Sequence, residues 1–193
     1  MKTLILLAHQ RPESFCHAIA EAAAEELTRL GHEFCLRDLY ADKFDPVLPD
    51  EEIPKGSPAA PQVQEHVDEL MSSEGVIVVH PNWWAGPPAI LKGWLDRCLR
   101  PGVAYDFMAG GIQGHLGDKR VLVFSTSNTP REIELKVYGD PLENFWKTCV
   151  WRFCGVKEEN YLRRNFESIV MSTPEERAEW LEATRAIVRE RMA

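Results

Sequence analysis

The chain alternates between short, continuous apolar runs and longer segments in which apolar residues recur every three or four positions. Three runs show no regular polar alternation: TLILLA at 3–8, GVIVVH at 75–80 and RVLVFS at 120–125. Such runs are typical of strands buried on both faces. Two weaker runs predict further strands at 33–39 and within 160–171. The hydrophobic pattern therefore predicts five strands.

Helical periodicity separates these strands. From 14 to 30 the apolar residues are spaced three and four apart, and Gly31 follows as a C′ glycine. The last helix has a clear start, because Thr173 is a good N-cap, Pro174 takes the first helical position and Glu176 completes a capping box. Further helices are predicted at about 61–73, 87–99 and 141–153.

Strands that are apolar throughout and that alternate with helices indicate a parallel sheet covered on both faces. We expect one α/β domain over residues 1–193, a doubly wound five-stranded parallel sheet with helices on both faces. Three connections are expected to be irregular: a proline-rich excursion at 40–61, a glycine-containing loop at 102–118 and a polar loop at 126–134.

The composition argues against several classes of function. The 193 residues carry a formal net charge of -8, which argues against nucleic acid as the main partner, because a phosphate backbone requires a basic stripe. No apolar stretch approaches the roughly 18 residues of a membrane span, so membrane insertion is not expected. The five cysteines form no C-x-x-C pair, and we expect reduced thiols in a cytoplasmic protein.

Polar and aromatic residues are concentrated where three predicted strands end. HQRPESF follows the first strand, HPNWWAGPPA starts at the end of the strand at 75–80, and STSNTPRE starts at the end of the strand at 120–125. In an open parallel sheet, ligands bind outside the carboxyl ends of the strands. Taken together, the three segments favour a ligand site at one edge of the sheet.

The first segment leads into a helix N-terminus, where free backbone N–H groups and the helix dipole suit a phosphate group. His9 and Ser14 are the candidate side-chain donors. Ser14 is equally explained as a simple N-cap, and the residues alone leave both interpretations open. The chain contains no G-x-G-x-x-G turn and no P-loop, so neither nucleotide-binding motif is predicted.

Two adjacent tryptophans distinguish the second segment. Trp83 and Trp84 could stack on a planar ring, with the backbone near Asn82 and Gly86 meeting the polar edge of that ring. The alternative is that both are core or interface aromatics. Because adjacent residues at a strand end point in opposite directions, we expect one of the two to have that structural role.

The third segment offers donors and acceptors at 125–128, although these are also ordinary turn residues before Pro130. Other chemistry is not indicated. The six histidines show no metal-ligand spacing, so no metal site is expected, and there is no G-x-S-x-G nucleophile motif. His80 fits a satisfied buried histidine as well as a site residue.

Four segments carry more specific motifs: LAHQRPESFCHAIAEAA, DLYADKFDPVL, HPNWWAGPPAILKGWLDRCL and FCGV. Together they resemble the NAD(P)H:quinone oxidoreductase family, the DT-diaphorase-like flavoproteins that include ancillary oxidoreductases of potassium-efflux systems. The resemblance extends from about Lys2 to the C-terminal helix. It implies a flavodoxin-like fold, a bound flavin (FAD or FMN), NAD(P)H as co-substrate and a quinone-like acceptor. It also implies a homodimer whose active sites lie at the subunit interface.

Carried over position by position, the resemblance assigns flavin contacts to three groups of residues. The group around the phosphates and ribityl chain comprises His9, Ser14, Phe15 and Ala18, with Cys16 where the family has asparagine. The segment along the isoalloxazine ring comprises Pro81, Asn82, Trp83, Trp84 and Ala85. The family's T-T-G-G loop is replaced by Ser125, Thr126, Ser127 and Asn128. Tyr138 stands where the mammalian enzymes have a histidine near the flavin N1/O2 edge, so Trp84, Asn128 and Tyr138 are the residues expected at the reacting ring.

The implied function is hydride transfer from NAD(P)H through flavin N5 to a quinone in a ping-pong cycle. Two alternatives stay open: a regulatory flavoprotein that docks on a potassium-efflux transporter, and a flavodoxin-type electron carrier. The aromatic, non-acidic loop at 80–88 argues against the carrier. FAD and FMN are not distinguished, because the 40–61 excursion resembles the FAD-using members whereas Glu13 and Cys16 depart from the family pattern.

Overall fold

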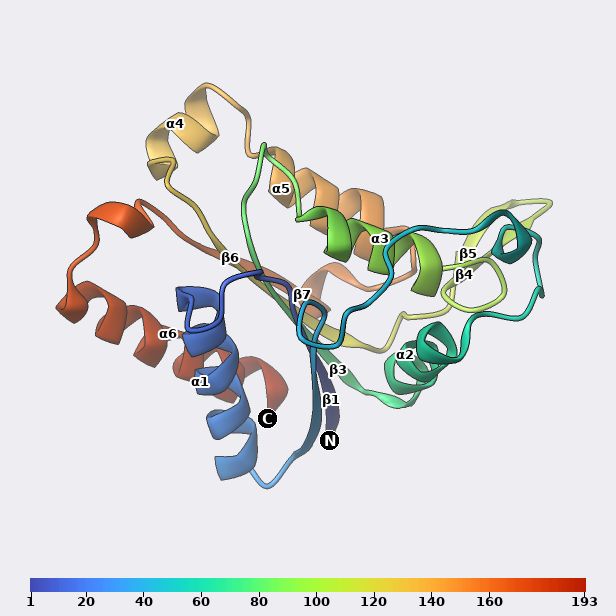
Figure 1. Cartoon of the computed structure of the whole chain (residues 1–193), viewed down its shortest axis with the longest axis horizontal. Coiled ribbons are helices and arrows are strands. Elements are labelled where there is room, and N and C mark those ends of the chain that lie inside the picture. Colours follow the sequence, from blue (N-terminus) through green and yellow to red (C-terminus); the bar gives the residue numbers. More distant parts are fainter.

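Five parallel strands form the centre of the computed structural model, which describes all 193 residues (Figure 1). The strands are β1 (Lys2–Leu7), β2 (Glu33–Asp38), β3 (Gly75–Pro81), β6 (Arg120–Thr126) and β7 (Tyr161–Phe166). They lie in the order β2-β1-β3-β6-β7, and each neighbouring pair is parallel. The doubly wound five-stranded sheet predicted from the sequence is therefore confirmed.

Helices cover both faces of this sheet (Figure 1). One face is covered by α1 (Phe15–Arg29) and α6 (Pro174–Met192). The other is covered by α2 (Pro61–Ser72), α3 (Ala89–Cys98) and α5 (Pro141–Glu143), which continues directly as the π-helical segment η2 (Asn144–Arg152). Each face has its own hydrophobic cluster, so the sheet is the wall between two halves of the core.

The strand β3 shows why its sequence is apolar throughout. Val76 and Val78 belong to the cluster under α2 and α3, whereas Ile77 and Val79 belong to the cluster under α1 and α6. Because successive side chains of a strand point to opposite faces, a central strand buried on both faces needs an apolar residue at every position. The continuous apolar run is therefore the direct signal of a central position in the sheet.

The structure differs from the sequence prediction in two connections. The segment 102–118, expected as a loop, contains an antiparallel hairpin of β4 (Tyr105–Met108) and β5 (Gly111–Gly114). The polar loop expected at 126–134 is wrong in its second half, because α4 (Arg131–Lys136) begins directly after Pro130. Both elements are too short and too exposed to give a hydrophobic period. Short 3₁₀ helices complete the chain: η1 (Asp50–Glu52), η3 (Glu158–Asn160) and η4 (Ile169–Met171).

Two helix ends follow the sequence signals. Thr173 Oγ1 accepts a hydrogen bond from the Glu176 N–H at 3.2 Å, and the Glu176 carboxylate accepts one from the Thr173 N–H at 2.8 Å, which completes the predicted capping box. Gly31 has φ of +73° after α1, as a C′ glycine requires. No helix combines the length and the apolar character that crossing a membrane requires.

The strand order places a switch point between β1 and β3. The chain leaves β1 to add β2 on one side, and later returns to add β3 on the other side of β1. At such a point the connections after the two strands diverge and leave a crevice at their carboxyl ends, where doubly wound sheets bind ligands. The loops that follow β1, β3 and β6 all open at this edge.

Candidate functional site at the carboxyl edge of the sheet

The three polar segments predicted from the sequence meet at this edge. The Asn82 N–H donates to the Thr126 carbonyl at 2.6 Å, which joins the second segment to the third. The rings of His9 and Trp83 lie 6.3 Å apart between centroids, which joins the first segment to the second. Cys16 Sγ lies 3.4 Å from Thr126 Oγ1 and joins the first to the third. The expectation that these segments form one site is consistent with this geometry.

A cavity of about 690 Å³ lies between the β3–α3 and β6–α4 connections. Its wall is formed by Asn82, Trp84, Ala85, Asn128, Thr129, Glu134 and Tyr138. All of these except Thr129 and Glu134 are residues singled out from the sequence. The volume falls in the range of small-molecule and cofactor sites, which is about 300–1,000 Å³.

Residues 83–86 form a tight turn that presents Trp84 to solvent. Trp83 and Gly86 exchange two backbone hydrogen bonds of 3.0 Å, and the central residues Trp84 and Ala85 have φ of +52° and +61°. This left-handed conformation costs a residue with a Cβ roughly 1–2 kcal/mol. The Trp84 side chain is fully exposed and Trp83 is 38% exposed, so neither is a core residue, and the expected interface role for one of the two stays a prediction. A strained backbone that displays an aromatic ring is an observation that points to a ligand.

At the N-terminus of α1, the Ser14 hydroxyl does not cap the helix. Instead Ser14 Oγ is hydrogen-bonded to His17 Nδ1 at 2.8 Å, and His17 Nε2 lies 3.3 Å from Asp38 Oδ2 at the end of β2. The first N–H groups of α1 therefore have no side-chain cap and are open to an anion. His17 was not predicted, although a spacing of three on a helix brings it beside Ser14.

His9 supplies a neutral donor at the same end of the site. Its Nδ1 accepts a hydrogen bond from the Arg11 N–H at 3.1 Å, so the ring proton is carried by Nε2. Burial, followed by the nearby His17 and Arg11, holds the pKa of His9 below its ordinary value. A neutral imidazole with an N–H beside a cationic side chain suits a negatively charged ligand.

Two of the predicted cofactor residues face inward. The Phe15 ring packs against Phe166 and Trp180, with centroids 6.1 and 5.8 Å apart. The Cys16 thiol is buried, and burial raises its pKa to about 12, so it is a neutral thiol. Phe15 and Cys16 can therefore offer a ligand only their backbone, whereas the partly buried Ala18 lies in the next turn.

The third segment contributes mainly through Asn128. Ser125 is fully buried, and Thr126 and Ser127 are nearly so. The Ser127 hydroxyl donates to the Thr129 carbonyl at 3.0 Å, as in an ordinary polar turn. Asn128 is exposed and lines the cavity. The side chains of residues 125–127 are therefore engaged within the protein, only that of Ser127 in a turn, and the ligand interpretation rests on Asn128.

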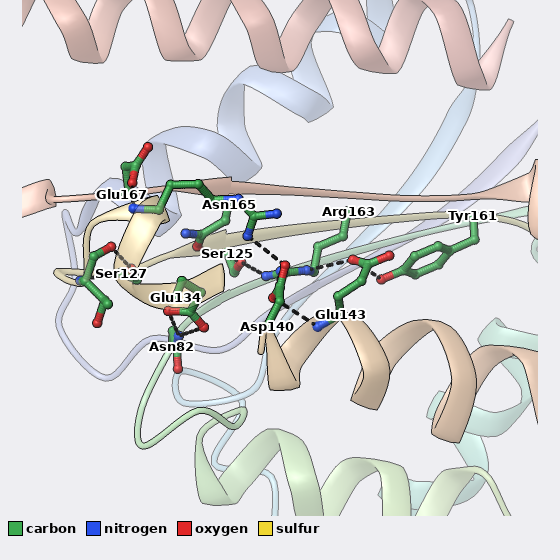
Figure 2. Close-up of polar contacts among 12 residues, drawn as sticks. Asn82, Ser125, Ser127, Glu134, Asp140, Glu143, Tyr161, Arg163, Asn165 and Glu167 are labelled. Atoms are coloured by element: carbon green, nitrogen blue, oxygen red, sulfur yellow. Dashed lines mark hydrogen bonds and ion pairs between the residues drawn. The ribbon is translucent and has the colours of Figure 1, made fainter. Parts of the chain in front are cut away.

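A partly buried ionic network ties β7 to the start of α5 and to α4 (Figure 2). Arg163 donates to Ser125 Oγ at 3.2 Å, to the Glu143 carboxylate at 3.0 Å and to the Asp140 carboxylate. Arg131 also donates to Asp140, at 2.7 Å. The network holds the start of α5 against the sheet. It was not predicted, because its members come from four different segments of the chain.

Next to this network, Glu134 and Asn82 point toward each other across the cavity wall (Figure 2). Asn82 Nδ2 donates to the two carboxylate oxygens of Glu134 at 3.3 and 3.5 Å. Glu134 is only 1% exposed. Asn82 Oδ1 is buried and has no hydrogen-bond partner. The wall of the cavity therefore contains a buried carboxyl group and a buried, unpaired acceptor.

His80 has a structural role. It is fully buried, its Nε2 accepts a hydrogen bond from Trp146 Nε1 at 2.9 Å, and its Nδ1 lies 2.9 Å from the Pro81 carbonyl. These partners are satisfied by one neutral tautomer, protonated at Nδ1. Burial lowers the pKa of His80 to about 4. Of the two interpretations that the sequence left open, the satisfied buried histidine is confirmed.

These features define an α/β protein with a small-molecule site at the switch point of a doubly wound sheet. Comparison with known sequences specifies the family. The sequence model described as flavodoxin-like fold matches residues 1–191, and the chain belongs to this family.

Proteins similar in sequence to this chain are named as NAD(P)H dehydrogenases or oxidoreductases. The chain is 32% identical over 177 residues to NAD(P)H dehydrogenase (quinone) 1 of Cavia porcellus, covering 80% of this chain and 64% of that protein. It is 32% identical over 166 residues to an uncharacterized NAD(P)H oxidoreductase of Haemophilus influenzae, covering 83% and 82%. The chain thus spans a little less than two thirds of the Cavia porcellus relative but most of the bacterial one.

A solved structure supports the same family assignment. The NAD(P)H:quinone oxidoreductase of Methanothermobacter marburgensis superimposes with a TM-score of 0.85 at 27% identity, covering 98% of this chain and 96% of that one. The family resemblance inferred from the sequence motifs is therefore confirmed.

Proposed function

We propose that this protein is a cytoplasmic, flavin-dependent NAD(P)H oxidoreductase that reduces a quinone or a similar acceptor. The observation that carries the proposal is the cavity at the switch point, with the strained and fully exposed Trp84 on its wall. The names of the relatives from Cavia porcellus and Methanothermobacter marburgensis support the reaction. The five unpaired cysteines support a reducing compartment.

The residues at the cavity fit a flavin. A Cβ added at Gly86 would have only the Trp83 carbonyl near it, at 3.7 Å, so the turn leaves open space beside its backbone. The unpaired Asn82 Oδ1 is an acceptor that suits a ring N–H after a small rotation of the side chain. The uncapped N-terminus of α1 suits the phosphate. A polar edge, an open backbone and an anion site are the three features that support this proposal.

Each part of the site has a task in this proposal. His9, Ser14 and the first N–H groups of α1 hold the phosphate, and Trp84 forms a wall for the ring. When bound, a flavin supplies hydride transfer at N5 in a ping-pong cycle between NAD(P)H and the quinone. Asn128 and Tyr138 line the side on which the substrates alternate. Because hydride transfer needs no strong acid or base, orientation and exclusion of water supply most of the acceleration.

We also propose a homodimer that closes the cavity. Beside Tyr138, the short helix α4 exposes Ile133 and Leu135, and Val137 follows with 64% exposure. Together with Trp84 these side chains form an apolar rim around the cavity, which a second copy of the chain would cover. This is the arrangement that the family resemblance implies.

The test is to purify the protein, release any bound chromophore and identify it by mass, which also distinguishes FAD from FMN. The apoprotein is then titrated with each flavin, and turnover is measured with NADH or NADPH and a simple quinone. We expect one flavin per chain and quinone-dependent oxidation of the nicotinamide. A colourless protein that binds neither flavin would refute the proposal. Bound flavin without quinone turnover would instead favour the regulatory or carrier alternatives.

A further inference from the structure

The side chain of Asn82 is held at one end and unpartnered at the other. Its Nδ2 donates to both carboxylate oxygens of Glu134, at 3.3 and 3.5 Å (Figure 2). Its Oδ1 is buried and has no hydrogen-bond partner. Because a buried amide carbonyl without a partner is costly, this oxygen is suited to a donor that a ligand brings.

The backbone of Asn82 is fixed as well. Its N–H donates to the Thr126 carbonyl at 2.6 Å, and the turn that follows is closed by the two 3.0 Å hydrogen bonds between Trp83 and Gly86. Any adjustment to a ligand therefore comes from rotation of the Asn82 side chain. Since its contact with Glu134 is shared between two oxygens, a small rotation can keep one of these hydrogen bonds.

The carboxylate of Glu134 is placed by the backbone of α4. The Glu134 N–H donates to the Pro130 carbonyl at 3.0 Å, and its carbonyl accepts from the Asp140 N–H at 2.9 Å. The helix buries Glu134, which is 1% exposed, and leaves its neighbours Ile133 and Leu135 40% and 48% exposed. Burial of apolar surface favours the opposite arrangement. The register of α4 is therefore not explained by packing, and what it provides is the contact with Asn82.

This contact also fixes which way the Asn82 amide points. The nearby acid Asp140 accepts from Arg131 and Arg163, whereas the one side chain hydrogen-bonded to Glu134 is Asn82. Carboxylate oxygens accept hydrogen bonds, so the amide must turn its NH2 group toward Glu134. If the amide turned over, its carbonyl oxygen would face two other oxygens. The carbonyl is therefore kept as the free end of the side chain.

We propose that Glu134 is a positioning residue of the flavin site: by holding the NH2 group of Asn82, it presents the Asn82 carbonyl oxygen to the ring N–H. This inference rests on the proposed function, in which Asn82 Oδ1 accepts from that N–H. Glu134 does not touch the ring and acts only through Asn82. The consequence is selectivity, because the site favours a planar ring with an N–H at this edge over one without it.

The amide needs such a partner because its two ends have nearly the same shape. Without Glu134, the oxygen and the NH2 group could exchange places, and a donor would then face the N–H of the ring. The oxidised isoalloxazine ring has a single N–H, at N3. An acceptor that is fixed before the ligand arrives avoids the cost of ordering the side chain during binding.

The experiment compares the wild type with Glu134→Gln and uses Glu132→Gln as the matched control. In Glu134→Gln an NH2 group of similar shape replaces one acceptor oxygen, so either orientation of the Asn82 amide is satisfied. Glu132 lies on the same helix, but its side chain is 70% exposed and ion-paired with Lys136 at 2.6 Å. Each apoprotein is titrated with FMN and with 3-methyl-FMN, in which a methyl group replaces the N3 hydrogen. The corresponding FAD pair is used if the purified protein holds FAD.

We expect the wild type and Glu132→Gln to bind the parent flavin about tenfold more tightly than its 3-methyl form, because the methyl group leaves the Asn82 acceptor unpaired. In Glu134→Gln this preference should fall by about threefold or more. A purely structural role would leave the preference unchanged, since glutamine keeps the size and shape of the side chain.

The same preference in all three proteins, or no preference in the wild type, overturns the inference and leaves the proposed function intact. A protein that binds no flavin overturns both. Should Glu134→Gln fail to fold, a crystal structure of the flavin-loaded wild type decides. An Asn82 side chain that bridges the Glu134 carboxylate and ring N3 supports the inference, and one that contacts only one of them refutes it.

Discussion

Trp84 has an unfavourable backbone conformation and an unburied side chain, and nothing in the free protein compensates for either. Its φ of +52° and its full exposure mean that the residue contributes no packing to the fold. Large aromatic side chains usually stabilise proteins by burial. We propose that the benefit comes from a ligand, and two expectations follow for binding and stability.

Replacing Trp84 with alanine is expected to raise the flavin dissociation constant about tenfold, because stacking on an aromatic ring contributes about 1–3 kcal/mol. The melting temperature of the apoprotein should not change, since the side chain buries nothing. Flavin titration and thermal unfolding check the two statements. Trp83→Ala is the comparison variant, because Trp83 lies in the same turn but not on the cavity wall. Unchanged flavin content and turnover in Trp84→Ala would show that the ring is not a flavin wall.

His80 should make the stability of the protein depend on pH. Its pKa is near 6.5 when unperturbed and about 4 in the folded state, so the unfolded chain binds more protons between these values. The stabilisation by the neutral ring is complete above pH 6.5 and is lost as the pH falls toward 4. The difference amounts to about 3 kcal/mol at most.

Urea unfolding from pH 7 to pH 4 tests this expectation in the wild type and in His80→Gln, which has no titratable ring. The free energy of unfolding should fall more steeply with decreasing pH in the wild type. Parallel pH dependence of the two proteins would mean that His80 is not the group that titrates.

Some site residues can be identified from the sequence, and others cannot because their roles depend on partners elsewhere in the chain. Trp84 and Asn82 are visible because they stand in a conspicuous segment at a strand end, whereas Tyr138 is found only through the family resemblance. Glu134 and His17 are not, since each acquires its role from a partner in another element or turn: Asn82 for the first, and Ser14 with Asp38 for the second. A single charged residue in a polar stretch looks like a solvated side chain until the fold buries it.

At the scale of elements, the helix α6 could be predicted from the sequence and the helix α4 could not. The helix α6 has 19 residues and a complete capping box, and its start could be predicted to the residue. The helix α4 has six residues, and its apolar Ile133 and Leu135 are exposed while Glu134 is buried. Its pattern is the reverse of an amphipathic surface helix, so no periodicity argument could find it. The β4–β5 hairpin escapes prediction in the same way, since Phe107 and Ile112 are exposed.

The capping box of α6 gives a prediction at this scale. Thr173→Ala removes the acceptor for the Glu176 N–H and should lower the free energy of unfolding by about 1 kcal/mol. Urea unfolding measures the loss. Glu179→Gln, an exposed change in the middle of the same helix, is the control and should have little effect. Equal stability of Thr173→Ala and the wild type would show that the cap does not contribute.

At the scale of the whole molecule, the sheet could be predicted because its strands are buried on both faces and so carry an uninterrupted apolar signal. The strand order and the alternation of strands and helices then fix where the loops meet. The hydrophobic pattern cannot predict the exposed apolar rim beside the cavity, because a sequence does not show whether an apolar residue is exposed or buried.

The exposed apolar rim predicts that the protein forms a homodimer. Wild-type protein should sediment as a dimer at micromolar concentration, and Val137→Asp should sediment as a monomer, because an unpaired carboxylate in a desolvated interface is costly. Glu132→Gln, on the exposed side of α4, should stay dimeric. Analytical ultracentrifugation distinguishes these states. A monomeric wild type would remove the proposed role of the rim in closing the cavity.

The exposure of Trp84 also gives the protein an optical label. Trp94, Trp146 and Trp151 are fully buried, so a charged collisional quencher such as iodide reaches the indole of Trp84 long before it reaches theirs. The quenchable part of the intrinsic emission then comes chiefly from Trp84, with smaller parts from the partly exposed Trp83 and Trp180. Any planar molecule that binds in the cavity will shield the Trp84 indole from the quencher. Occupancy of the cavity can therefore be measured by tryptophan fluorescence quenching without attaching a dye.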